Sequence, residues 1–428
     1  MSLLQRGEHA ACKYTEKFAH LLNSYNGDPL DVSFRELVGP LPSDDLTHSV
    51  YPYPARLLRQ IPRMLLRCEQ IVADIDHVID PFCGSGTVLL EAQRAGFGAT
   101  GIEQNPIGAL ASKVKTTPIN SKSFESLCRE VLKEAKRTRK YLEPSAYVTK
   151  WYSPEAYSAL CRLASVIRED SGPHHAAVEL TLALTARRTA CTDRRIPVPV
   201  RPRHPIGYSG QDVWESWERE ASALARRIET LDGSLPTATV TVGDTRRESS
   251  WSQAPASGRS LVITSPPYGA AQKYIRSSSL ELGWLGLSDS KGTVKLEHSS
   301  IGREHLSRAD KLAQQNISNH RVVSILNDIR LVSPTRAAIY ATYFSDMESA
   351  LRHFKVHAMR VVLVSGTNTV AGLEIATHEL LGELLSNYGF RKELSLRDEI
   401  RGRALLTKRR ASAAPARAEY IDVFEFGQ

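Results

Sequence analysis

A stretch of ten residues constrains the fold of this chain more than any other. Residues 78–87 read VIDPFCGSGT, and the apolar run Val88-Leu89-Leu90 follows without a break. This pattern predicts a short buried strand, a glycine turn and the start of a helix. In that arrangement α/β proteins present backbone N–H groups and a helix N-terminus to a ligand. The rest of the chain is therefore placed relative to this turn.

A second predicted strand lies close behind the turn. Residues 99–102 form it, and it ends in Glu103, nineteen residues after Gly84. An acidic side chain at that distance lies at the tip of the neighbouring parallel strand, where it accepts hydrogen bonds from the two hydroxyls of a nucleoside ribose. A nicotinamide dinucleotide site would carry a third glycine in G-x-G-x-x-G, but Leu89 occupies that position. On these residues alone, an ordinary strand-turn-helix corner remains an alternative.

A further buried strand runs straight into two prolines. Residues 261–268 read LVITSPPY. Proline donates no hydrogen bond to a ladder and holds the preceding residue extended, so the strand must end at Ser265. The residues after it form a rigid loop at the C-terminal edge of the sheet, where ligands of such sheets bind.

The glycine turn and the proline loop, in this order, resemble the amino-type DNA methyltransferases, which use S-adenosylmethionine. DPFCGSGT is similar to their cofactor loop, and SPPY to their catalytic loop in the variant most often associated with cytosine-N4 methylation. Residues 51–57 resemble the segment that closes over the methionine part of the cofactor, and residues 242–244 resemble the strand end whose acidic residue contacts the adenine. The resemblance implies cofactor binding by Tyr53, Pro54, Asp80, Phe82, Gly84, Gly86, Thr87, Glu103 and Asp244.

The chemistry of amine methylation agrees with this resemblance. An exocyclic amine is a poor nucleophile because its lone pair is delocalised into the ring, so a catalyst must hold it tetrahedral and in line with the methyl sulfonium. The Ser265 hydroxyl and a loop carbonyl can accept the two amine hydrogens, while the prolines keep these acceptors fixed. Tyr268 offers a stacking face to a base that has left the duplex. The catalytic residues implied are Ser265, Pro266, Pro267 and Tyr268.

Cysteine usage argues against other chemistries. Methylation at cytosine C5 needs a cysteine nucleophile in a Pro-Cys loop, and the sequence contains no Pro-Cys dipeptide. Cys83 lies inside the glycine turn, where a small buried residue is the simpler interpretation. The six cysteines form no C-x-x-C pair, so neither a disulfide framework nor a metal site is indicated.

Composition and charge suit a globular protein with a polyanionic partner. The net charge is +8 over 428 residues, with 42% hydrophobic and 24% charged residues. The first residues lack the apolar core of a signal peptide, and no apolar run reaches the length that crosses a membrane. We therefore expect a cytoplasmic protein that does not bind membranes, and the resemblance implies that its polyanionic partner is double-stranded DNA.

About 135 residues separate Glu103 from the predicted strand at 238–242, and helical patterns dominate them, over 124–142, 154–168 and 176–189. Arginines spaced by prolines follow, up to Pro205, and we interpret them as an extended arm that contacts DNA phosphates or guanine edges. A solvated surface loop is the alternative. Trp214 and Trp217 are predicted to pack in the core. The candidate DNA-binding residues are Arg187, Arg188, Arg194, Arg195, Arg201 and Arg203.

The C-terminal part contains two polar stretches and the last predicted elements of the sheet. Residues 288–330 are broken by glycines and form a second candidate for DNA contact, or a lid over the site. The basic segment 397–410 is either a phosphate-binding segment or a solvated loop. A strand at 360–364, a helix at 377–388 and a strand at 420–426 resemble the family's last sheet elements.

These observations predict an α/β fold, namely a Rossmann-like, seven-stranded, mostly parallel class I methyltransferase sheet with a largely helical insertion. We expect an N-terminal cap at 1–46, a cofactor-binding half at 47–120, an Arg-rich insertion at 121–237 that is a candidate for DNA recognition, and a catalytic half at 238–428. The insertion precedes the strand at 238–242, whereas the family arrangement places it after that strand, so which of the two inserted regions reads the DNA stays open.

The resemblance implies site-specific methylation of an exocyclic base amine in DNA, cytosine N4 ahead of adenine N6. Methylation of guanine N2 or adenine N6 in RNA competes with it, and the lack of a recognisable RNA-binding module favours DNA. A non-catalytic DNA-binding subunit of the same fold is a third alternative, against which the intact SPPY argues. The family also implies a restriction-modification or phage-defence role with a separate endonuclease.

Overall fold

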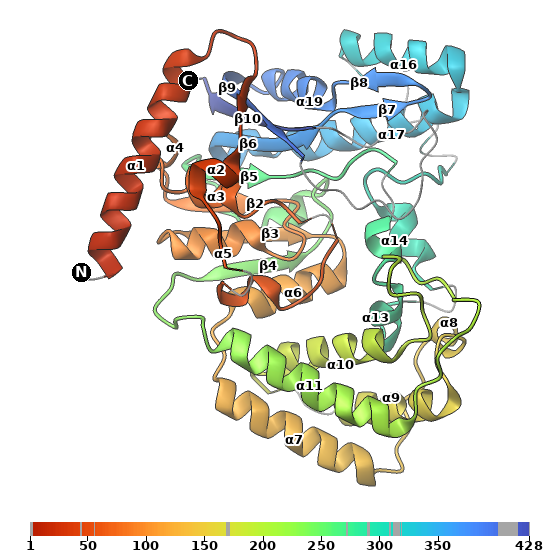
Figure 1. The fold of residues 1–428 in the computed structure, drawn as a ribbon. Coiled ribbons are helices and arrows are strands. Elements are labelled where there is room, and N and C mark those ends of the chain that lie inside the picture. Colours follow the sequence, from red (N-terminus) through yellow and green to blue (C-terminus); the bar gives the residue numbers. More distant parts are fainter. Residues whose placement is uncertain are drawn as a thin grey trace.

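An eight-stranded central sheet organises the part of the chain that the structure describes (Figure 1). In this computed structural model the described residues are 3–42, 45–54, 56–167, 172–270, 273–288, 292–307, 310, 317, 319–400 and 418–427. The strand order is β1-β9-β10-β6-β5-β2-β3-β4. The strands are β1 Leu30–Val32, β2 His77–Asp80, β3 Gly98–Glu103, β4 Ala238–Val242, β5 Ser260–Thr264, β6 Ala358–Gly366, β9 Phe390–Glu399 and β10 Ala418–Phe426.

Most neighbouring strands of the sheet run parallel, and only β10 pairs antiparallel, with both β6 and β9. This confirms the predicted α/β class with a mostly parallel sheet. The predicted count of seven strands is wrong, because β1 adds an eighth strand at one edge, parallel to β9. The strand β1 is only three residues long and shows no periodicity of its own, so only its pairing with a distant segment defines it.

The strand β9 is also absent from the elements that the sequence predicts. Six of its ten residues, FRKELSLRDE, are charged, which hides the strand pattern. Leu394, Ser395 and Leu396 are nevertheless all buried. Arg397 belongs to this strand and pairs with Asp31 at 2.6 Å, so the first residue of the basic segment 397–410 has a structural partner. Residues 401–410 lie outside the described residues.

Helices cover both faces of the sheet, so successive side chains of one strand enter two different cores. In β6, Val361 and Leu363 face the core shared with α17 and α19, while Val362 and Val364 face the core shared with α1, α3 and α5. Strands buried on both faces read as continuous apolar runs, which is why β5 and β6 were predictable. The covering helices are α1 Leu3–Ser24, α3 Gln60–Leu65, α4 Glu69–Val72, α5 Thr87–Arg94, α17 Pro334–Leu351, α18 Phe354–His357 and α19 Thr377–Ser386.

The helical insertion lies beyond the β4 edge of the sheet, where its helices pack on one another (Figure 1). Trp217 is 1% exposed in that core and donates from Nε1 to the carbonyl of Cys128 at 3.0 Å, and Trp214 is buried as well. The prediction that both tryptophans pack in the core is confirmed. The helices of the insertion are α7 Ser121–Arg137, α8 Ala146–Thr149, α9 Pro154–Ile167, α10 His175–Thr189 and α11 Gly210–Ile228, and α6 Pro106–Thr116 packs between the β3–β4 edge of the sheet and α10.

Short elements complete the described part of the chain. The structure adds a helix, α16, that begins inside the polar stretch 288–330, where the Asn319 side chain caps it by accepting from the Val322 N–H at 2.9 Å. None of the helices formed by the described residues combines the length and the apolar composition that a membrane crossing requires. The remaining elements are α2 Phe34–Val38, α12 Lys273–Arg276, α13 Ser279–Trp284, α14 Val294–Ser299, α16 His320–Val332, β7 Asn368–Val370, β8 Leu373–Ile375 and the 3₁₀ turns Leu46–Ser49 and Glu248–Trp251.

Candidate functional site

The strand order reverses beside β2, and this reversal positions a cavity. From β2 the chain moves outward to β3 and β4, then returns to β5 on the other side of β2. Loops at such a switch point diverge and leave a crevice beyond the carboxyl ends of the strands. A cavity of about 340 Å³ lies there, lined by residues at the ends of all four strands, including Asp80, Glu103, Gly243 and Ser265.

The glycine turn packs too tightly for any larger residue. Gly84 and Gly86 have φ angles of +52° and +78°, in the left-handed region that favours glycine. A Cβ on Gly86 would lie 2.2 Å from Oγ of Ser112 on α6, and one on Gly84 would lie 3.1 Å from the Tyr53 ring. The turn therefore packs directly against α6 and the Tyr53 ring, and its backbone at Gly84 lines the cavity.

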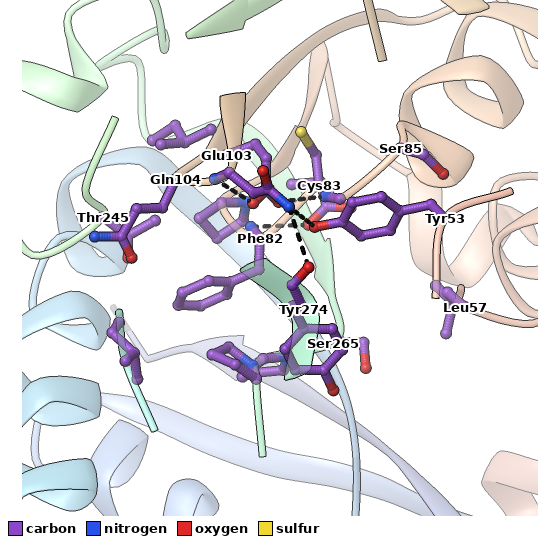
Figure 2. A pocket seen from close by; sticks show the side chains of 18 of the residues that line it. Tyr53, Leu57, Phe82, Cys83, Ser85, Glu103, Gln104, Thr245, Ser265 and Tyr274 are labelled. Carbon is purple, nitrogen blue, oxygen red and sulfur yellow. Dashed lines mark hydrogen bonds between the residues drawn. The ribbon is translucent and has the colours of Figure 1, made fainter. Parts of the chain in front are cut away.

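Glu103 lies deep in the cavity with part of its surface open to it. Its carboxylate accepts hydrogen bonds from the backbone N–H of Gly84 at 2.7 Å and of Asn105 at 2.8 Å. Burial raises the pKa of Glu103 to about 7, although these backbone hydrogen bonds oppose the shift. Figure 2 shows Glu103 and Tyr53 turned toward each other, with Ser265 further along the cavity. The carboxylate is thus oriented for a ligand with hydroxyl donors.

Asp80 connects the glycine turn to the proline loop. Its Oδ1 accepts from the Phe82 N–H at 3.1 Å and from the hydroxyl of Thr264 at 2.7 Å. Thr264 is the last residue of β5, directly before Ser265. Burial raises the pKa of Asp80 to about 7. One buried side chain therefore fixes the distance between the two motifs.

Asn105, Tyr274 and Glu419 complete this wall, and the sequence analysis missed Asn105 and Glu419. The Asn105 amide donates to the Tyr53 hydroxyl at 3.4 Å and to the Tyr274 carbonyl at 3.5 Å, and the Asn105 carbonyl oxygen caps α6. Asn before Pro106 is a helix-start signal that would have located this residue in the sequence. Glu419, at the start of β10, has no local signal of this kind.

The four residues of the proline loop all line the cavity, opposite the glycine turn. The segment that follows α14 holds this loop in place: a Cβ on Gly302 would lie 2.5 Å from the carbonyl oxygen of Tyr268. Ser300 and Ile301 line the cavity beside it, and Gln104 donates to the Ser299 carbonyl at 2.9 Å. Part of the polar stretch 288–330 is thus a wall of the cavity.

Asp244 differs from the other predicted cofactor residues. Its neighbours Gly243 and Thr245 line the cavity, but Asp244 does not. Its carboxylate accepts two hydrogen bonds from the guanidinium of Arg246, at 2.9 and 2.7 Å, and Arg246 also pairs with Asp346 at 2.7 Å. Burial raises the pKa of Asp244, but the Arg246 contacts outweigh it and lower the pKa overall. The predicted cofactor residues that line the cavity are Tyr53, Pro54, Asp80, Phe82, Gly84, Thr87 and Glu103, whereas Gly86 does not line it.

The sulfur chemistry of the site is inert. Cys83 lines the cavity, and burial raises the pKa of its thiol well above the ordinary value. A thiolate nucleophile is therefore absent at neutral pH. The burial agrees with the interpretation of Cys83 as a small packing residue.

The arginines of the predicted DNA-binding arm separate into two groups. Arg187 pairs with Glu281 at 2.7 Å, Arg188 with Glu220 at 2.9 Å and Arg195 with Asp193 at 2.6 Å, so these three hold structural ion pairs. Arg187 and Arg188 belong to the end of α10 and not to the loop after it. The unpaired group is Arg194, Arg201 and Arg203, which are exposed and form no ion pair with a described carboxylate. None of the six lines the first cavity.

Asp45, His48 and Glu91 converge beside the glycine turn in a way that resembles a metal-ligand set. Arg63 lies between the carboxylates, however, and donates to Asp45 at 2.5 Å and to Glu91 at 2.7 Å. Burial raises the pKa of Glu91, but hydrogen bonds from His48 and Arg63 outweigh it and hold the pKa at about 2. The cluster is an ion-pair network that anchors α3 to α5.

Comparisons with known proteins add a limited similarity. No protein-family model matches the chain. The type II methyltransferase M.MvaI of Kocuria varians is 38% identical over 76 residues, which are 18% of this chain and 17% of that protein. The type II methyltransferase M.MjaII of Methanocaldococcus jannaschii is 29% identical over 101 residues, which are 24% of this chain and 19% of that protein. The chain therefore matches less than a fifth of the length of either relative.

Among solved structures, the rRNA methyltransferase aviRa from Streptomyces viridochromogenes aligns over 92% of this chain and 96% of its own, with 11% identity and a TM-score of 0.29. A TM-score this low carries no weight for fold or substrate. The two type II methyltransferases confirm the resemblance to the amino-type DNA methyltransferases, and they do not bear on the SPPY variant of the loop.

Proposed function

We propose, from this resemblance to amino-type DNA methyltransferases, that the protein transfers a methyl group from S-adenosylmethionine to the exocyclic amine of a base in DNA. Cytosine N4 is the first candidate, and adenine N6 the second. The observation that carries the proposal is that the glycine turn and the SPPY loop, almost 180 residues apart in the sequence, line one cavity and are connected through Asp80 and Thr264.

The residues of the cavity fit S-adenosylmethionine. Its ribose hydroxyls would donate to Glu103, and the glycine turn, packed too closely on Ser112 and Tyr53 for a side chain at either glycine, would present its backbone to the cofactor. Tyr53 and Pro54 would cover the methionine part. Asp244 is the predicted adenine contact, and this role would require the carboxylate to be shared with Arg246. When bound, the cofactor supplies an electrophilic methyl group on a sulfonium.

The chain's own contribution to the reaction is positioning. The Ser265 hydroxyl and a loop carbonyl accept the two hydrogens of the amine, so the lone pair is directed at the methyl group. Pro266 and Pro267 keep these acceptors rigid, and Tyr268, held from behind by Gly302, presents its ring to the base. The base must leave the duplex to reach this cavity. No covalent intermediate with the protein forms, in agreement with the protonated Cys83.

One competing substrate, one non-catalytic alternative and one partner follow from the same premise. The same positioning would act on a base amine in RNA, and a non-catalytic subunit would retain the cavity without turnover. A serine in the loop favours cytosine N4, since aspartate at that position is more usual for adenine. A role in a restriction-modification or phage-defence system, with a separate endonuclease, is part of this proposal.

Nucleoside mass spectrometry of plasmid DNA from a host that expresses the protein tests the proposal. We expect N4-methylcytosine with the wild type and none with the Ser265→Ala/Tyr268→Ala double variant. Tyr141→Ala is the matched control, because Tyr141 is 48% exposed and lines neither cavity, and it should leave methylation unchanged.

The alternatives give different results in the same measurement. N6-methyladenine that vanishes in the double variant would keep the mechanism and overturn the choice of base. Unmodified DNA together with methylated bases in the host RNA would move the substrate to RNA. If neither nucleic acid is methylated although the cofactor binds, the protein is a non-catalytic subunit.

A further inference from the structure

A second cavity lies on the other side of the segment that begins with Tyr51. Its volume is about 380 Å³, and the wall on the far side comes from the helical insertion, through α10, α11 and the loop at 192–199. Five arginines line it: Arg56, Arg187, Arg188, Arg194 and Arg227. Arg56 belongs to the segment 51–57 that resembles the cover of the cofactor, whereas Arg227 was not singled out from the sequence.

The acidic residues of this cavity are already paired. Glu281, 1% exposed, accepts from Arg187 at 2.7 Å and from the Tyr51 hydroxyl at 3.0 Å. Glu220 pairs with Arg188 at 2.9 Å, and Asp193 pairs with Arg195 at 2.6 Å. Five arginines against three carboxylates leave the lining with an excess of two positive charges.

Three of the lining guanidinium groups form no ion pair with any described carboxylate. Arg56 donates to the His48 carbonyl at 3.0 Å, and burial, with the nearby charge of Arg59, lowers its pKa. Arg194 donates only to oxygen atoms without charge, the Arg188 carbonyl at 2.6 Å and the Tyr208 hydroxyl at 2.7 Å. Arg227 has no side-chain partner among the described residues. Cations that face a cavity without a counterion favour an anionic ligand.

The second cavity adjoins the first. Arg56 lines both. The segment after the proline loop also contributes to both, since Tyr274 and Ile275 line the first cavity, whereas Ser277 and Leu280 line the second. A chain of nucleotides whose base enters the first cavity would therefore pass close to the second.

We propose that the second cavity binds a phosphodiester group of the nucleic-acid strand that delivers the base, through Arg194 and Arg227, with Arg56 at the boundary between the two cavities. This inference rests on the proposed function. Guanidinium forks match phosphate oxygens in geometry and charge. The apolar part of the lining, Val50, Leu184, Ile196, Pro197, Val198, Pro199 and Leu280, offers the sugar a surface that inorganic phosphate would not use.

Equilibrium binding to labelled oligonucleotides at several salt concentrations tests this site, in the full-length protein. We expect Arg194→Ala/Arg227→Ala to weaken binding to duplex DNA about tenfold at low salt and to reduce the slope of log K against log salt by roughly 1 to 2, because each phosphate contact contributes about 0.9. Affinity for S-adenosylmethionine should stay unchanged. Arg227→Lys, which keeps the charge, should retain most of the affinity.

The matched control is Arg129→Ala/Arg137→Ala, which removes two exposed arginines of α7 that line neither cavity. If both double variants have the affinity and salt slope of the wild type, or lose them equally, the second cavity is not a phosphate site. The same holds if the wild type binds no nucleic acid. Should the double variant not fold by circular dichroism, Arg194→Gln alone carries the test, with a slope change of about 1 expected.

The methylation assay is run on the same samples, which separates the two proposals. The Arg194→Ala/Arg227→Ala variant could lose DNA affinity and salt slope while even the wild type methylates nothing. That result would keep the phosphate site and reject the methyltransferase activity. Normal binding by the variant, with methylation by both, would reject the phosphate site and keep the enzyme. An RNA oligonucleotide of the same sequence forms a further arm. A slope change for RNA alone would keep the site and change its ligand from DNA to RNA.

Discussion

The two cavities of this protein are built in opposite ways. The first is made from strand ends, a glycine turn and short buried side chains, and its geometry follows from backbone conformation: positive φ at two glycines and prolines after β5. The second is made from long arginine side chains on α10, α11 and a loop, which meet segments far away in the sequence. Arg187 and Glu281, for example, are 94 residues apart.

The two cavities differ in how much of their geometry follows from local sequence. In the first cavity a local sequence dictates the local backbone, and the backbone shapes the cavity. In the second, the run of arginines in the sequence indicates positive charge but not the role of each arginine. Whether an arginine stabilises the fold or faces a ligand depends on which carboxylates the fold brings to it, as the contrast between Arg187 and Arg194 shows.

The largest effect should come from Gly86→Ala, which strains the glycine turn that forms part of the first cavity. We expect the free energy of unfolding to fall by about 2–4 kcal/mol, because φ strain at +78° adds to a clash with Ser112. Urea unfolding measures it. Gly96→Ala is the control, since Gly96 has a φ of +92° but no atom within 4 Å of the added Cβ, and strain alone should cost about 1 kcal/mol. Equal losses in the two variants would contradict the close packing of the turn.

The second prediction concerns the charge of Glu103. The ribose hydroxyls need an ionised acceptor, so affinity for S-adenosylmethionine should rise as pH rises through about 7, by roughly 100-fold between pH 5 and 8. Without ligand the sign for stability is opposite: the folded pKa is raised, so the folded protein loses stability as pH rises from about 4.5 to about 7. Calorimetric titration across this range measures the affinity, and Glu103→Gln should bind weakly with a flat profile. A flat wild-type profile would refute the role of Glu103.

The third prediction separates structural from ligand-facing arginines in the second cavity. Arg187→Ala should lower the free energy of unfolding by about 2 kcal/mol, since it leaves the buried Glu281 without its cation, whereas Arg194→Ala should change it by less than about 0.5 kcal/mol. Thermal and urea unfolding measure both. Adding Glu281→Gln to Arg187→Ala should recover part of the loss. If Arg187→Ala is neutral, the division of the arginines is wrong.

The smallest effect is expected at the exposed arm. Arg201→Ala and Arg203→Ala should each weaken DNA binding by no more than about 1 kcal/mol and reduce the salt slope by about 1, because an exposed phosphate contact is purely electrostatic. Titration at two salt concentrations measures this. An unchanged slope for both would identify the arm as a solvated loop and leave DNA contact to the second cavity.

Much of the first cavity was predictable from the sequence, because each motif there is a local rule. Glycines with positive φ, prolines that end a strand and an acidic residue at the end of the next strand require no knowledge of distant residues. The same rules located β2, β3, β5 and β6, whose apolar runs are buried on both faces. Asn105 was recognisable too, as a cap before Pro106, but was not singled out.

The α/β class, the order of the two motifs and the residues that form them could all be read from the amino-acid sequence. The tertiary structure was needed to show that Asp80 accepts a hydrogen bond from Thr264, that Gly302 packs against the proline loop, that β1 pairs with β9, and which arginines of the second cavity form no ion pair with a described carboxylate. The physical reason is the range of the interaction. Backbone preferences act over a few residues, while ion pairs and packing join segments whose proximity exists only after the chain has folded.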